Sequence, residues 1–239
     1  MKKLLAILGG AALAAAWGVM GYKGWTWIPI GAPAKEGQIK VACVGDSITY
    51  GAMIPNWYRY NYPHVLQKLA GSGYCVHNYG MSGRTAMHTG DHPYVREPRY
   101  LRSKAFQPDI VLLKFGTNDS KPQNWLGREE FKKQYRKLLE SYLNLSSKPR
   151  VILLQPAAPH HLHGEEGDVY TFDIQRSKVL EAGEVIRELA LEYGLATVDI
   201  FALTEKHPDW FVDDGIHPNA IGAQKLAEAV WEAIQPSEK

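Results

Sequence analysis

The chain alternates short apolar runs with longer segments in which apolar residues recur every three or four positions. Most of the short runs are nearly continuous in apolar side chains, as expected for strands of a parallel sheet that is covered on both faces. The five predicted strands are Ile39–Val44, Tyr74–Tyr79, Ile110–Phe115, Val151–Gln155 and Ala196–Ile200.

The segments between these runs have the one-sided apolar pattern of amphipathic helices. The predicted helices are Tyr62–Ala70, Arg128–Leu145, Gln175–Tyr193 and a last one from about Asn219 to Ile234. In the last helix Asn219 is the expected N-cap, and Ile221 is placed on the inward face together with Ala223 and Leu226. Strands that alternate with helices predict an α/β three-layer sandwich with a doubly wound sheet.

The N-terminus has the pattern of an export signal. Lys2 and Lys3 precede an apolar run from Leu4 to Tyr22, and the small residues at 14–16 offer a cleavage site. The run is also long enough to serve as an uncleaved anchor through residues 4–22. Either alternative places the remainder outside the cytoplasm, as a secreted, periplasmic or outward-facing anchored protein. We therefore predict a leader at 1–22, a Pro- and Gly-containing linker at 23–37 and one domain at 38–236.

Composition narrows the possible partners and the state of the cysteines. The net charge is only +2, so neither a nucleic-acid partner nor an acidic substrate is implied. The two cysteines, Cys43 and Cys75, both fall in predicted parallel strands. An exported protein could pair them, but small buried residues are needed at such positions, which favours two buried free thiols.

Polar and glycine residues follow the first three predicted strands. They form Gly45-Asp46-Ser47, Gly80-Met81-Ser82-Gly83 and Gly116-Thr117-Asn118-Asp119, and a fourth block, Asp214-Gly215-Ile216-His217, precedes the last helix. Doubly wound proteins bind their ligands at the carboxyl ends of the strands. Each block alone is equally compatible with an ordinary turn or helix cap.

Together the four blocks supply the parts of a serine nucleophile site. Ser47 supplies a hydroxyl, His217 a base, and Asp214 a carboxylate that fixes the tautomer of the base. The backbone N–H groups of Ser47 and Gly80 and the side-chain amide of Asn118 are the candidate donors to an oxyanion. Asp46 is expected to cap or support this site.

Two other sets of polar residues are given structural interpretations. Asp213 adjoins Asp214, so both carboxylates cannot face His217, and Asp213 is expected to face solvent or to cap the loop. The histidines at 160, 161 and 163 lie in a Pro-containing stretch and are interpreted as part of a surface loop. A metal site there would need a further ligand that the pattern does not offer.

The four blocks, in this order and spacing, resemble the SGNH (GDSL-like) hydrolases over Ile39 to Ile234. The resemblance implies a flavodoxin-like sandwich with five parallel strands in the order 2-1-3-4-5. It also implies an acyl-ester hydrolase without metal or organic cofactor. Carried over by motif, Ser47 is the nucleophile, Gly80 and Asn118 are oxyanion donors, His217 is the base and Asp214 its partner. Ile48 replaces the leucine of the usual first block.

A looser resemblance concerns the substrate. Gly116–Trp125 and Asp209–Phe211 are similar to exported bacterial esterases that deacetylate carbohydrates, and Trp57 and Tyr58 offer rings for sugar stacking. These features favour short-chain, O-acetyl esters on carbohydrates. The alternatives are a lysophospholipase or thioesterase acting on longer acyl chains, and a non-catalytic carbohydrate-binding surface protein. The last would be expected to have lost a member of the triad.

Overall fold

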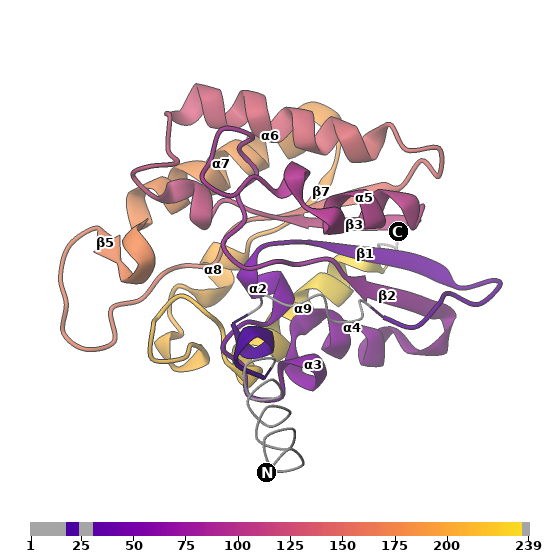
Figure 1. Cartoon of the computed structure of the whole chain (residues 1–239), viewed down its shortest axis with the longest axis horizontal. Helices are drawn as coiled ribbons and strands as arrows, with labels where there is room; N and C mark the ends of the chain where they lie inside the picture. Colours follow the sequence, from indigo (N-terminus) through magenta and orange to yellow (C-terminus); the bar gives the residue numbers. More distant parts are fainter. Residues whose placement is uncertain (1–17, 24–30, 236–239) are drawn as a thin grey trace, which may run out of the picture.

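The computed structural model describes residues 18–23 and 31–235. Its centre is a parallel sheet in the order β2-β1-β3-β4-β7 (Figure 1). The strands are β1 (Ile39–Gly45), β2 (Tyr74–Asn78), β3 (Ile110–Lys114), β4 (Arg150–Leu154) and β7 (Ala196–Val198). Because β7 is the fifth strand of this sheet along the chain, the predicted order 2-1-3-4-5 is confirmed.

Helices cover both faces of the sheet, which confirms the three-layer sandwich (Figure 1). Successive residues of a strand point to opposite faces. Val44 and Leu113 therefore pack with α6 (Arg128–Leu143) and α7 (Arg176–Tyr193), whereas Cys43 and Leu112 pack with α4 (Tyr62–Ala70) and α9 (Ala220–Ile234). This double coverage explains why the strands are nearly continuous in apolar residues.

The last helix corrects one prediction. Asn219 caps α9 as expected, since its side chain accepts hydrogen bonds from the N–H groups of Ile221 and Gly222. Ile221, however, is 57% exposed. The buried stripe includes Ala223 and Leu226, and Ile221 lies about 200° around the helix from Ala223 at roughly 100° per residue. Its side chain therefore points to solvent.

Several short elements were not predicted. The predicted strand at 196–200 ends early because Asp199 caps a short helix, its side chain accepting from the N–H of Ala202. The short helices are α2 (Ser47–Tyr50), α3 (Trp57–Tyr60), α5 (Pro98–Ala105) and α8 (Ile200–Thr204). The 3₁₀ turns are η1 (Gly71–Gly73), η2 (Tyr94–Arg96), η3 (Asn118–Ser120), η4 (Thr171–Asp173) and η5 (Pro208–Trp210). A small antiparallel ribbon consists of β5 (Val169–Tyr170) and β6 (Ile174–Gln175).

The described part of the N-terminal region contacts the sheet domain at two places. The carbonyl of Tyr22 accepts a hydrogen bond of 2.9 Å from the N–H of Met53. Further on, the carbonyl of Ala32 lies 2.7 Å from Nε2 of His77 on β2. Part of the predicted linker thus runs along the domain. Most of the predicted leader falls on residues 1–17, outside the described residues, and the boundaries at 22 and 37 stay predictions.

Two further observations concern the state of the cysteines and the length of the helices. Cys43 and Cys75 are both buried and free, as favoured by the sequence. Among residues 18–23 and 31–235, no helix combines the length and the apolar character needed to cross a membrane.

Candidate active site

The turn after β1 presents Ser47 at the carboxyl edge of the sheet. Asp46 caps α2, since its Oδ1 accepts a 3.0 Å hydrogen bond from the N–H of Ile48, and Ser47 is the first residue of that helix. A side chain at Gly45 would collide with Thr49 and with the carbonyl of Lys114, so the turn requires glycine. Ser47 is 5% exposed and is held in place by the helix that it begins.

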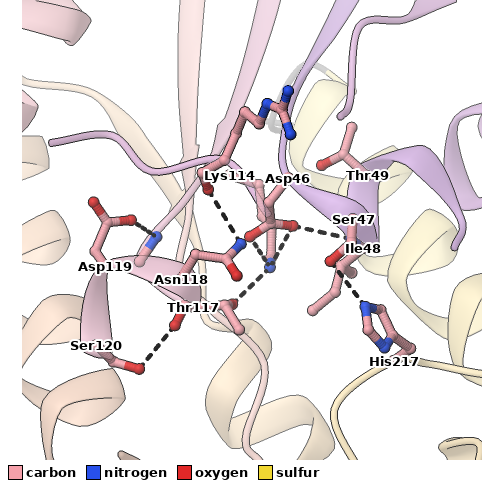
Figure 2. Close-up of polar contacts among 12 residues, drawn as sticks. Asp46, Ser47, Ile48, Thr49, Lys114, Thr117, Asn118, Asp119, Ser120 and His217 are labelled. Carbon is pink, nitrogen blue, oxygen red and sulfur yellow. Dashed lines mark hydrogen bonds and ion pairs between the residues drawn. The ribbon is translucent and has the colours of Figure 1, made fainter. Parts of the chain in front are cut away.

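His217 and Asp214 reach Ser47 from the loop before α9. His217 Nε2 lies 2.9 Å from Ser47 Oγ (Figure 2), and His217 Nδ1 lies 2.7 Å from Asp214 Oδ2. The other carboxylate oxygen, Oδ1, accepts hydrogen bonds of 2.8 and 2.9 Å from the N–H groups of Ile216 and His217. The loop that carries the base is therefore folded around the carboxylate. The structure brings the three predicted triad residues into one hydrogen-bonded series.

The charge of Asp214 determines the direction of these hydrogen bonds. Burial raises the pKa of Asp214, but the hydrogen bond and charge of His217 and the two backbone N–H donors outweigh burial and lower the pKa below its usual value. An ionised carboxylate can only accept, so Nδ1 of His217 carries the proton. Nε2 is then the free acceptor for the hydroxyl proton of Ser47.

Ser47 and His217 open into a pocket of about 320 Å³. Asn118, at the start of η3, also lines it, and its Nδ2 donates a 3.1 Å hydrogen bond to the carbonyl of Arg84. An amide nitrogen carries two hydrogens, so this bond orients the group and leaves the second hydrogen for another acceptor. Asn118 thus lines the same pocket as Ser47.

Gly80 lies elsewhere, against its predicted role as an oxyanion donor. Its N–H donates a 2.9 Å hydrogen bond to Asn78 Oδ1, and a side chain at this position would collide with the backbone of Thr49 and Tyr50. The glycine of the same block that lines the pocket is Gly83, with φ at +78°. Gly80 is therefore needed for close packing against α2, and Gly83 faces the space beside Ser47.

A buried ion pair lies directly behind the nucleophile. Lys114 Nζ is 3.0 Å from Asp46 Oδ2 and 3.0 Å from the hydroxyl of Thr117 (Figure 2). Both charged side chains are at most 1% exposed. Burial lowers the pKa of Lys114, and the carboxylate of Asp46 opposes this. The pair connects the start of α2 to the loop of Asn118. In the sequence, its only indication is a single lysine within an otherwise apolar strand.

Asp119 fastens the same loop from the other side. Its two oxygens accept hydrogen bonds of 2.9 and 3.1 Å from the N–H groups of Met87 and Gly116. Complete burial raises the pKa of Asp119 to about 6, although these donors work in the opposite direction. The segment that follows Gly83 and the segment that holds Asn118 are joined through this carboxylate.

The aromatic residue at the pocket is not among those proposed for sugar stacking. Trp57 and Tyr58 line a separate cavity of about 420 Å³ beside β2, and Trp125 packs against Phe131. Instead Phe172, from the turn between β5 and β6, lines the pocket with its ring 5.7 Å from that of His217. Phe172 is 50% exposed and has φ at +63°, an uncommon conformation for an aromatic residue.

The remaining polar candidates lie outside this pocket. Asp213 is exposed, as predicted. Nε2 of His160, His161 and His163 lies 3.1 Å from a backbone carbonyl in each case, but from three different ones. Within the described ranges, no group of three or more His, Cys, Asp or Glu side chains is arranged to hold a metal ion.

Comparison with known proteins is consistent with this geometry. Residues 43–225 match the model of the GDSL-like lipase/acylhydrolase family. The acetylxylan esterase of Xylanibacter ruminicola is 37% identical over 219 residues, which cover 87% of this chain and 46% of that protein. A multidomain esterase of Ruminococcus flavefaciens is 28% identical over 236 residues, covering 84% of this chain and 29% of that protein. The chain thus spans less than half the length of these relatives.

Solved structures share the fold at lower sequence identity. The native aryl esterase of M. smegmatis superposes with a TM-score of 0.62 at 19% identity, covering 81% of this chain and 97% of that one. A carbohydrate acetylesterase from Sinorhizobium meliloti gives a TM-score of 0.62 at 20% identity, covering 82% and 97%. At these identities the likeness establishes the architecture.

Proposed function

Because the chain belongs to the GDSL-like lipase/acylhydrolase family and is a serine ester hydrolase, we propose that it removes acetyl groups from carbohydrates, with Ser47 as nucleophile. The observation that carries this proposal is the hydrogen-bonded series Ser47–His217–Asp214 opening into a small pocket. The predicted leader supports a place of action outside the cytoplasm, with residues 38–236 as the catalytic domain.

The proposed reaction has two acyl-transfer steps. Ser47 Oγ attacks the ester carbonyl while His217 Nε2 takes its proton, and Asp214 stabilises the resulting imidazolium. The oxyanion is bound by the backbone N–H of Ser47, the N–H of Gly83 and Nδ2 of Asn118. His217 then protonates the leaving alcohol. A water molecule, activated by the same histidine, releases the acid from Ser47.

The size of the pocket supports a short acyl group. Its volume of about 320 Å³ has to accommodate both the acyl group and part of the alcohol. Ligand pockets span roughly 300–1,000 Å³, so this one is near the lower end. The names of two similar proteins, an acetylxylan esterase and a carbohydrate acetylesterase, support the same choice. A long acyl chain would leave little of this volume for the alcohol.

The acyl-length preference tests the proposal directly. We expect kcat/KM for p-nitrophenyl acetate to exceed that for the octanoate ester by about tenfold or more, because the longer chain would compete with the alcohol for space in the pocket. The leaving group is the same in both esters, so the ratio reports only on the acyl side. Acetate release from acetylated xylan is expected alongside. A strong preference for octanoate would support the long-chain alternative and contradict our proposal.

Asn118→Ala tests the proposed oxyanion donor. We expect kcat for p-nitrophenyl acetate to fall by about 10²–10³, because the developing negative charge loses one preorganised hydrogen bond. The matched control is Asn144→Ala, since Asn144 lies at the exposed C-terminal end of α6. Circular dichroism establishes that both variants are folded. A folded Asn118→Ala enzyme with nearly unchanged kcat would remove Asn118 from the mechanism.

A further inference from the structure

Two lysines line the pocket that contains Ser47 and His217. Lys23 comes from the N-terminal segment, and Lys121 directly follows η3. Among the described residues that line this pocket there is no carboxylate side chain. Two acidic residues of the site are already paired within the protein: Asp214 with His217, and Asp46 with Lys114. The electrostatic character of the pocket is therefore positive, which the small net charge of the whole chain conceals.

Both lysines are held in place by backbone hydrogen bonds. The carbonyl oxygen of Tyr22 accepts a hydrogen bond from the N–H of Met53, which itself lines the pocket, and this contact brings the segment of Lys23 to the pocket. The carbonyl of Lys121 accepts hydrogen bonds of 2.9 Å from the N–H groups of Asn124 and Trp125. Two segments far apart in the sequence thus each contribute a lysine to the lining of one small cavity.

Neither ammonium group forms an ion pair with a residue that the structure describes. Within residues 18–23 and 31–235, the ion pairs of lysine involve Lys114, Lys132, Lys133, Lys178 and Lys225. Lys23 and Lys121 do not belong to any of these ion pairs. An anionic group on the substrate would therefore meet two lysines at the pocket that no described carboxylate pairs with.

Resting on the proposed function, we propose that the natural substrate is an acetylated acidic glycan. A carboxylate on the acetylated sugar, or on its neighbour, binds Lys23 and Lys121 while the acetyl carbonyl lies at Ser47. The exposed ring of Phe172 offers an apolar surface for the face of the sugar. The net charge of the whole chain gives no indication of such a substrate.

The test compares two polymers that differ only in charge. One is acetylated glucuronoxylan, and the other is the same polymer after carboxyl reduction and re-acetylation to the same degree. For the unaltered enzyme at low salt, we expect kcat/KM for acetate release to be about three- to tenfold higher on the charged polymer, as two partly exposed ion pairs would give. The ratio is expected to shrink as sodium chloride is raised, because salt screens exposed charges.

The variant Lys23→Gln/Lys121→Gln connects the ratio to these two residues. In this variant the ratio of kcat/KM between the charged and the reduced polymer is expected to fall close to one. The control Lys68→Gln/Lys225→Gln removes the same charge from α4 and α9 and should leave that ratio unchanged. A ratio near one in the unaltered enzyme, or an unchanged ratio in the first double variant, would overturn the inference. If the unaltered enzyme hydrolysed p-nitrophenyl acetate in that case, the proposed function would still stand.

Discussion

Ser47→Ala is expected to abolish ester hydrolysis, lowering kcat for p-nitrophenyl acetate by about 10⁴-fold or more. The variant keeps the pocket and the oxyanion donors but has no oxygen to form the acyl-enzyme. His217 Nε2 loses the hydroxyl that lies 2.9 Å away, so the base has no proton to take from the protein. Initial rates at saturating substrate measure the loss. The double variant Ser47→Ala/His217→Ala should lose little more, because the two residues act as one unit.

The control and the competing interpretation use the same assay. Ser141→Ala removes a hydroxyl that donates to the carbonyl of Leu138 within α6, far along the chain from the site, and should keep full activity. An organophosphonate probe is expected to label the unaltered protein and not Ser47→Ala. Substantial activity in Ser47→Ala would refute the assignment of the nucleophile. Absence of both hydrolysis and labelling in the unaltered protein would favour the non-catalytic carbohydrate-binding alternative.

The fold could be predicted because its main elements are determined by local pattern. The runs at Ile110–Phe115 and Val151–Gln155 are apolar except for Lys114 and Gln155, which identifies strands that are buried on both faces. The helix at Tyr62–Ala70 has the observed bounds, since Asn61 caps one end and glycine follows the other. The strand order followed from the family resemblance. The short elements escaped prediction because a helix such as α8 is too brief to show a period.

The site was predicted less completely, because proximity across the sheet is not visible in a single sequence. Gly80 and Gly83 belong to one block. Only the structure shows that the N–H of Gly80 already donates a hydrogen bond to Asn78 within the protein. Phe172 reaches the pocket from the turn between β5 and β6, and these two-residue strands are too short to show a periodic pattern. Lys23 was assigned to a linker, yet it lines the pocket because the preceding residue binds Met53.

Lys114→Met is expected to lower the free energy of unfolding by about 3–5 kcal/mol, the usual result of removing one partner from a buried ion pair. Asp46 would keep its hydrogen bond to the N–H of Ile48 but lose both contacts with the ammonium group. Its charge would then be buried without a counter-charge at 0% exposure. Because Asp46 caps the helix that begins at Ser47, kcat should fall together with stability. Urea unfolding measures the first effect and p-nitrophenyl acetate hydrolysis the second.

The double variant Asp46→Asn/Lys114→Met separates the charge of the pair from its position. Asparagine can still cap α2, and no uncompensated charge stays behind, so the double variant should be more stable than Lys114→Met alone. Lys225→Met provides the surface comparison: it breaks a solvent-exposed pair with Glu228, and only a small fraction of the effect is expected. If Lys114→Met unfolded at the same urea concentration as the unaltered chain, the pair would be dispensable for the fold. Recovery of stability in the double variant would instead show that Lys114 is required chiefly because Asp46 is charged. The carboxylate next to the nucleophile would then be the reason why the neighbouring strand β3 contains a lysine.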